Sequence, residues 1–128
     1  MAIYKQYKRL GEIDGKEVEF NITEEWSYDD IDVDGSFDFG SKEENQKYLD
    51  RFVSGELVSL ILGVKAEVFG CTGTDLLCGC HINVDNVDAD IADCINDKGM
   101  VDIAIEDCKR AIREQVETLT PFFVNLPK

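Results

Sequence analysis

Strict alternation of apolar and polar residues is the feature of this sequence that most restricts its fold. Residues 3–13 and 16–22 resemble strands, and the Asp14-Gly15 pair between them is a strong signal for a tight hairpin turn. Residues 57–69 and 76–84 repeat the period of two on either side of a glycine-rich stretch, 70–75. Because a period of two does not suit a helix, these segments predict two antiparallel hairpins.

The segment 30–39 alternates even more regularly and predicts one more strand. Its apolar residues fall on one side, and its aspartates fall on the other. On a strand these aspartates would form a row of carboxylates with a repeat of about 6.6 Å. They are Asp30, Asp32, Asp34 and Asp38.

Three segments have helical periodicity instead. Ser41 and Glu44 have the spacing of a capping box and predict the start of a helix. Residues 86–97 predict a short helix, and residues 100–119 predict a long helix that Pro121 ends. The predicted order is three strands, a helix, two strands and two helices. This order favours an α+β fold, an antiparallel sheet of about five strands with helices packed on one face.

The length of the chain suits a single α+β domain spanning residues 1–128, with enough residues to bury one core. No apolar run reaches the roughly 20 residues of a membrane helix. The N-terminal residues lack the apolar stretch of a signal peptide. Five cysteines, an odd number, indicate reduced thiols, so we expect a cytoplasmic location.

The charge of the chain is strongly acidic and unevenly distributed. There are 27 acidic and 13 basic residues, a net charge of −14. Residues 17–44 contain eleven acids and one base, and residues 66–97 contain seven acids and no base. This charge opposes direct binding to nucleic acid or to an anionic membrane. Clustered like charges repel each other and lower stability, so we expect them to serve binding.

The acidic segment around the second and third predicted strands is the candidate binding site. A carboxylate face attracts basic proteins at long range, and its repeat is close to two nucleotide rises of roughly 3.4 Å each. One alternative is that the acidic face only keeps the protein in solution. Another is that Trp26 and Tyr28 only pack over the sheet edge and hold the loop there. The predicted partner-binding residues are Glu17, Glu19, Glu24, Glu25, Trp26, Tyr28, Asp30, Asp32, Asp34 and Asp38.

These observations lead to the hypothesis of an acidic protein-binding module without catalytic residues or a cofactor. Its sharpest form is a nucleic-acid mimic that inhibits a DNA- or RNA-binding protein. The chain is similar, in charge and size alone, to the small acidic inhibitors of restriction and CRISPR systems made by phages and mobile elements. The predicted partner is therefore a basic protein surface, with no direct contact to nucleic acid or membrane.

A metal-binding domain is the first alternative function. The run from Asp30 to Gly35 matches the start of a calcium loop, and Asp38 falls at position nine. Ser41 occupies position twelve, where an EF-hand needs a bidentate glutamate. The alternative metal ligands are Asp30, Asp32, Asp34 and Asp38. A loop and a strand exclude each other here, because carboxylates converge in the loop and diverge along the strand.

A small enzyme is the second alternative. Cys71, Cys78, Cys80 and His81 are zinc-ligand types, but the usual paired C-x-x-C spacing is absent. Cys71 is the cysteine that we expect to be exposed, and a dyad with His81 across the hairpin is the nucleophilic alternative. The chain contains no P-loop, dinucleotide fingerprint or serine elbow. A second cluster of acids contains Asp85, Asp88, Asp90 and Asp93. We interpret Asp85 or Asn86 as the N-cap of the following helix and the other acids as suited to its dipole, with a metal site as the alternative.

Overall fold

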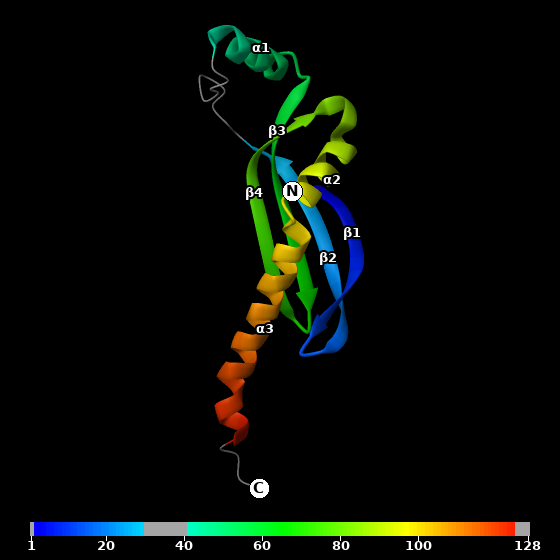
Figure 1. The fold of residues 1–128 in the computed structure, drawn as a ribbon, viewed down its shortest axis with the longest axis vertical. Coiled ribbons are helices and arrows are strands. Elements are labelled where there is room, and N and C mark those ends of the chain that lie inside the picture. The colour runs from blue at the N-terminus through cyan, green and yellow to red at the C-terminus, as the bar shows by residue number, and fades with distance from the viewer. Residues whose placement is uncertain (1, 30–40, 125–128) are drawn as a thin grey trace.

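The computed structural model describes residues 2–29 and 41–124 and shows an α+β fold (Figure 1). The described residues form one four-stranded antiparallel sheet in the order β1-β2-β3-β4, with three α-helices. The predicted strand over 30–39 lies outside the described residues, so the described sheet has four strands rather than about five. The elements are β1 (Ala2–Ile13), β2 (Lys16–Tyr28), α1 (Lys42–Val53), β3 (Leu57–Val68), β4 (Cys71–Asn83), a short 3₁₀ helix η1 (Val84–Asn86), α2 (Val87–Asp97) and α3 (Met100–Val124).

Both predicted hairpins are present, and both turn over two residues. The central residues have positive φ, 51° and 78° at residues 14–15 and 53° and 74° at residues 69–70. This is the pattern of a type I′ turn, whose twist matches that of the flanking strands. The second turn is shorter than the predicted stretch 70–75, because β4 already begins at Cys71 and pairs there with Val68.

Strand β2 extends to Tyr28, well beyond the predicted end at residue 22. Its second half pairs with β3, from Asn21 opposite Glu67 to Tyr28 opposite Leu60. Hydrogen bonds from strands on both sides therefore hold this polar segment extended. The pattern of apolar residues ends earlier because the added residues are mostly polar.

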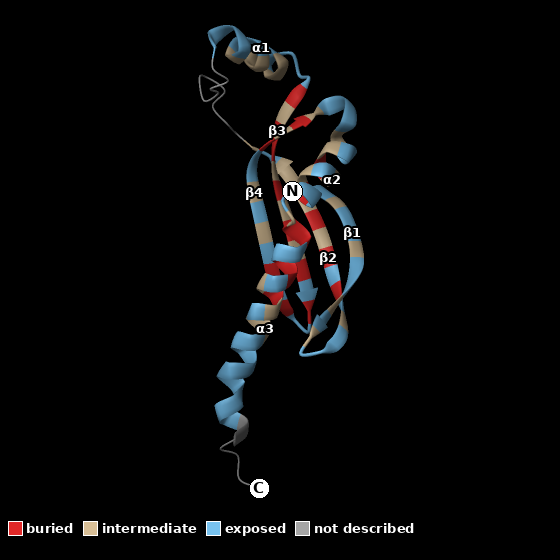
Figure 2. Cartoon of the chain, viewed as in Figure 1, coloured by how far each residue is buried: buried red, intermediate tan, exposed pale blue. Residues whose placement is uncertain are grey.

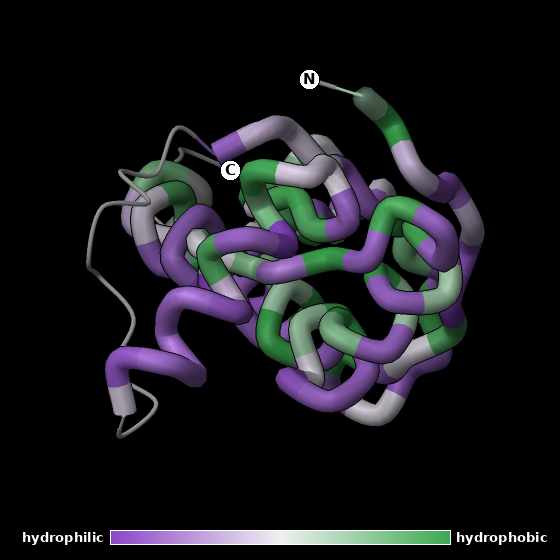
Figure 3. Tube along the Cα trace, turned by 90° about the horizontal axis from the view of Figure 1, so that it is seen from above, coloured by the Kyte–Doolittle hydropathy of each residue, from purple (hydrophilic) through white to green (hydrophobic). Residues whose placement is uncertain are grey.

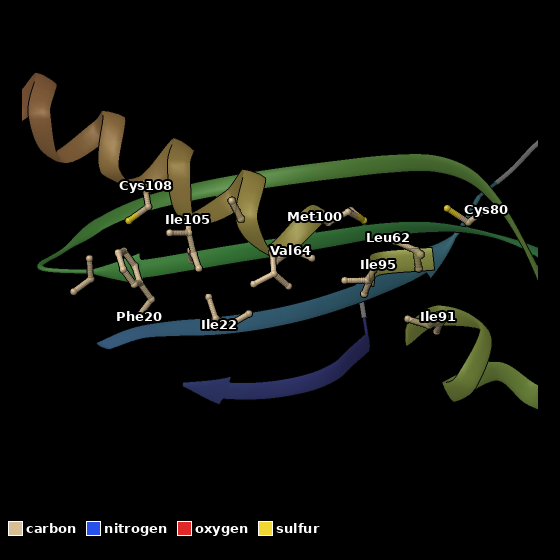
Figure 4. Packing of buried hydrophobic residues seen from close by; sticks show 14 of the residues in the cluster. Phe20, Ile22, Leu62, Val64, Cys80, Ile91, Ile95, Met100, Ile105 and Cys108 are labelled. Carbon is tan, nitrogen blue, oxygen red and sulfur yellow. The ribbon is translucent and has the colours of Figure 1, made fainter. Parts of the chain in front are cut away.

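The core lies between one face of the sheet and helices α2 and α3. Buried residues are concentrated on the central strands and on the first half of α3 (Figure 2). A view down the long axis shows hydrophobic and hydrophilic segments alternating along the trace (Figure 3). Ile105 and Cys108 of α3 point toward the sheet, where Phe20, Ile22 and Val64 meet them (Figure 4). This packing decides which face of each strand is left to solvent.

Helix α3 lies very close to β4 at Gly73. A Cβ atom at this position would collide with backbone atoms of Ala104, Asp107 and Cys108. The close approach also lets the backbone N–H of Thr74 donate to the Asp107 carboxylate over 3.0 Å. A glycine is therefore required here by the helix that crosses the strand.

The sequence predicts that helix α3 ends before Pro121. In the structure, the helix instead continues through Pro121 to Val124. The fixed φ of proline is compatible with a helix, and its ring removes one backbone hydrogen bond. The preceding residue, Thr120, donates its hydroxyl to the Val116 carbonyl over 2.6 Å. A single lost bond so near the end does not stop the helix.

Helix α1 begins as predicted, since the Ser41 hydroxyl accepts a hydrogen bond from the Glu44 backbone N–H over 3.1 Å. Its position differs from the prediction. Its side chains contact His81 and Asn83 of β4, which alternate with the core residues Cys80 and Ile82. Neighbouring residues on a strand point to opposite faces. Helix α1 therefore lies on the other side of the sheet, and packing of all helices on one face is wrong for α1.

Candidate protein-binding surface

The open face is our name for the face of the sheet opposite α2 and α3. On β2, Phe20 and Ile22 are buried under the helices, so their odd-numbered neighbours point to the open face. Residues directly opposite each other in the ladder lie on the same face. The register therefore shows which residues of β1, β3 and β4 point to the open face. Charged residues of the open face are Lys8, Glu12, Glu17, Glu19, Glu25, Lys65 and Glu67.

Four exposed carboxylates gather near the hairpin turns and form what we call the acidic sheet end: Glu12, Glu17, Glu19 and Glu67. Glu12 lies directly opposite Glu17 in the ladder. Glu19 forms an ion pair with Lys8 over 3.1 Å, between two side chains that are both more than half exposed. Within residues 2–29 and 41–124, the ion pairs leave Glu12, Glu17 and Glu67 without a cation partner. The acidic sheet end therefore presents uncompensated negative charge to solvent.

The predicted binding residues of β2 divide between the two faces. Glu17 and Glu19 are exposed and Glu25 is half-buried, all on the open face. Trp26 is half-buried and packs against the core, whereas Tyr28 is 69% exposed. The rings of Trp26 and Tyr28 meet edge to face, with centroids 5.5 Å apart. The structure thus keeps part of the predicted set together. The remaining predicted residues, Asp30, Asp32, Asp34 and Asp38, lie outside the described residues.

Glu24 faces the core, and its assignment to the binding surface is wrong. It is 5% exposed, and its Oε2 atom has no hydrogen-bond partner. Burial raises the pKa of the Glu24 carboxyl, against the opposing effects of the Lys5 ammonium and a hydrogen bond from Tyr7. The nearby Tyr4 hydroxyl donates to the Asp88 carbonyl over 2.7 Å, tying β1 to α2. Glu24 is therefore a buried residue that a partner cannot reach.

Sequence reasoning missed Glu12 and Glu67. A two-residue turn at Asp14-Gly15 places residue 12 opposite residue 17, so the hairpin signal itself could have identified the pair Glu12 and Glu17. Glu67 joins them only because β2 lies between β1 and β3, where it pairs with Asn21. That long-range pairing has no local signal.

The opposite end of the open face is covered by α1. The Tyr48 hydroxyl and His81 Nδ1 are 2.5 Å apart, and the Phe52 ring meets the His81 ring edge to face at 5.0 Å. Arg51 donates to the Asn83 side-chain carbonyl over 2.7 Å. Burial lowers the pKa of His81. The exposed acidic part of the open face is therefore limited to the end that carries the turns.

A second group of acids lies on α2 and η1. Asp85, Asp88, Asp93 and Asp97 are exposed. The Asp90 carboxylate accepts from the backbone N–H and the side-chain amide of Asn83, both over 2.9 Å, which lowers the Asp90 pKa. Asn86 precedes α2 but makes no side-chain capping bond. These acids therefore form a separate charged surface, and the predicted capping by Asp85 or Asn86 is not found.

The cysteines do not form the predicted arrangements. Cys71 is buried and its thiol donates to Gln115 Oε1 over 2.8 Å, whereas Cys78 is exposed. Cys71 and His81 sit at opposite ends of β4, about 33 Å apart along an extended strand. The nucleophilic dyad is therefore wrong, and so is the expectation that Cys71 is the exposed thiol. In the described part of the chain, no three histidine, cysteine or acidic side chains are arranged to hold a metal ion.

None of the helices in residues 2–29 and 41–124 is long and apolar enough to cross a membrane. Comparisons with models of protein families, with characterised proteins and with solved structures find no match to this chain. Function therefore has to be inferred from the charge and geometry of the surface.

Proposed function

We propose that this protein is an acidic binding module whose acidic sheet end engages a basic surface of another protein. The observation that carries the proposal is the pairing of Glu12 with Glu17 on an exposed face, with Glu67 one strand further along. Like charges directly opposite on neighbouring strands are destabilising, by up to about 1 kcal/mol. Lysine or arginine side chains of a partner would remove this repulsion on binding.

The sharpest form of the proposal is a nucleic-acid mimic. Glu17 and Glu19 follow each other on one side of β2, with a spacing of about 6.6 Å, close to two nucleotide rises of a DNA strand. Glu12 and Glu67 widen this line across three strands. A protein that binds nucleic acid through lysine and arginine would meet charges of suitable sign and spacing. DNA would then compete with this chain for the same partner.

The test compares two variants with the same loss of charge. In one, the acidic sheet end loses three carboxylates by the changes Glu12→Gln, Glu17→Gln and Glu67→Gln, which leave the ion pair of Glu19 intact. In the control, called the α2 variant, η1 and α2 together lose three exposed carboxylates by Asp85→Asn, Asp93→Asn and Asp97→Asn. Tagged proteins are used to capture partners from the producing organism at low and high salt. Captured partners are then identified, and their affinity is measured with and without DNA.

We expect the unmodified chain and the α2 variant to capture the same nucleic-acid-binding protein at low salt. The sheet-end variant should bind it about tenfold more weakly, because each exposed charge pair contributes at most about 1 kcal/mol. High salt and added DNA should release the partner. Equal binding by the two variants would refute the acidic sheet end as the site, and binding that DNA does not affect would refute the mimic.

A further inference from the structure

The second half of α3 extends beyond the sheet. The helix has 25 residues and is about 37 Å long. The contact of Cys71 with Gln115 lies at the start of β4, next to the β3–β4 turn. Residues 113–122 are all exposed, and Figure 1 shows this part of α3 past the ends of both hairpins. The acidic sheet end is therefore at the same end of the sheet as the free part of the helix.

The free part of α3 continues the apolar face that packs on the sheet. Ile105 and Cys108 are buried in the core, and Ile112 is half-buried against it. Residues at further steps of three and four fall on the same side of a helix. They are Val116, Leu119 and Phe122, with exposed fractions of 58%, 42% and 68%. These three residues and Ile112 form what we call the α3 stripe.

The charged residues of this helical segment lie on the remaining arc. Arg113, Glu114 and Glu117 are exposed and are offset from the stripe by helical geometry. The stripe therefore turns to the same side as the sheet, into the space beyond the hairpin turns. Phe69 in the β3–β4 turn is a further apolar residue at this end, 73% exposed. An apolar surface of this kind, bordered by polar residues, is typical of an interaction site.

Charge decides between the possible occupants of this surface. A second copy would bring another chain of net charge −14, with its own acidic sheet end, against the first. Like charges so close together repel. A basic amphipathic segment has the opposite charge and can also cover the stripe. Binding of an amphipathic helix by its apolar face is a common mode of recognition.

We propose that the α3 stripe and the acidic sheet end together bind a basic amphipathic segment of the partner protein. Its apolar side chains pack on Val116, Leu119 and Phe122, and its lysine or arginine side chains face Glu12, Glu17 and Glu67. This inference deepens the proposed function and rests on it. It requires a partner that offers apolar as well as basic side chains.

The test uses two synthetic 18-residue peptides of identical leucine, lysine and alanine composition. One places its leucines at helical steps of three and four, and the other has the same residues in scrambled order. Affinities for the full chain are measured by fluorescence anisotropy at 50 and 300 mM salt. The stripe variant carries Leu119→Ser and Phe122→Ser. Its matched control carries Val84→Ser and Ile103→Ser, two exposed apolar residues outside the stripe, 45% and 47% exposed.

We expect the unmodified chain to bind the amphipathic peptide at least tenfold more tightly than the scrambled one. The stripe variant should lose this preference, and the control variant should keep it. The sheet-end variant should bind both peptides more weakly and still prefer the amphipathic one. Equal binding of the two peptides by the unmodified chain, or an unchanged preference in the stripe variant, would overturn the inference.

Two further measurements separate this inference from the proposed function. If the natural partner is captured equally by the stripe variant and the unmodified chain, the stripe is not part of the site and the acidic sheet end alone binds. If sedimentation shows a dimer at micromolar concentration that the stripe variant abolishes, a second copy covers the stripe and the inference is wrong. Loss of capture only in the sheet-end variant would support the proposed function alone and contradict the inference.

Discussion

Replacing Gly73 with alanine should strongly destabilise the fold. The new Cβ would lie 2.7 Å from the Asp107 carbonyl carbon and closer still to backbone atoms of Ala104 and Cys108. A backbone cannot move aside as a flexible side chain does, so α3 would have to shift away from β4. Overpacking of a core typically costs about 1–3 kcal/mol, and we expect a value of about 3 kcal/mol.

Urea and thermal unfolding followed by circular dichroism would measure this change. For a chain of this size, about 3 kcal/mol corresponds to a Tm lower by about 10 °C. The urea midpoint should fall by about 1–2 M without a change in the slope, because the unfolded surface is the same.

The matched control is Gly63→Ala. A Cβ at Gly63 meets only Leu76 Cδ1 at 3.6 Å and the Asp75 carbonyl oxygen at 3.9 Å, which are ordinary contact distances. We expect a change within about 0.5 kcal/mol. If Gly73→Ala and Gly63→Ala shift the Tm equally, the close approach of α3 to β4 is not what requires glycine at position 73.

Three further predictions concern titratable groups. Burial raises the pKa of Glu24 above its ordinary 4.5, so the stability that the protonated carboxyl contributes is lost as pH rises through the raised pKa. Glu24→Gln should add about 1 kcal/mol to the free energy of unfolding at pH 7 and nothing at pH 4, and a decrease in that free energy at pH 7 would show that the charged form is favoured. Burial lowers the pKa of His81 below its ordinary 6.5, so docking of α1 should be strongest above that pH and weaken as pH falls from 7.5 to 5.5. Hydrogen exchange of the α1 amides, corrected for intrinsic rates, measures this, and equal protection at pH 7.5 and pH 5.5 would refute it. A water-soluble maleimide should label the native chain once, at exposed Cys78, because Cys71, Cys80 and Cys108 are buried and burial raises the pKa of the half-buried Cys94 thiol. Intact mass should show no fast adduct after Cys78→Ser, and two fast adducts on the unmodified chain would contradict the assignment.

Local signals in the sequence were sufficient for most of the secondary structure. The residues at 14–15 predict their turn because Asp and Gly tolerate positive φ. Ser41 and Glu44 predict the start of α1 because capping is a contact between near neighbours. The end of α3 was misjudged, because Pro121 acts on one hydrogen bond and so close to the terminus does not end the helix.

The binding surface was less predictable. Glu24 and Glu25 are adjacent and chemically alike, but one is buried and the other lies on the open face. Residue 24 has the same parity as Phe20 and Ile22, so its burial follows once β2 is known to continue past residue 22. The pairing with β3 decides that continuation, and it joins residues far apart in the chain.

The sequence by itself determined the net charge, the hairpin turns and the alternation that makes each strand two-faced. These properties depend on residue type and on neighbours a few positions away. Only the tertiary structure decided that α3 covers one face, that α1 contacts His81 and Asn83 at the far end of the sheet, and that Glu67 joins Glu12, Glu17 and Glu19 on the open face. The physical reason is that a face is left to solvent only after the helices have buried the opposite one, and that choice depends on contacts between distant parts of the chain.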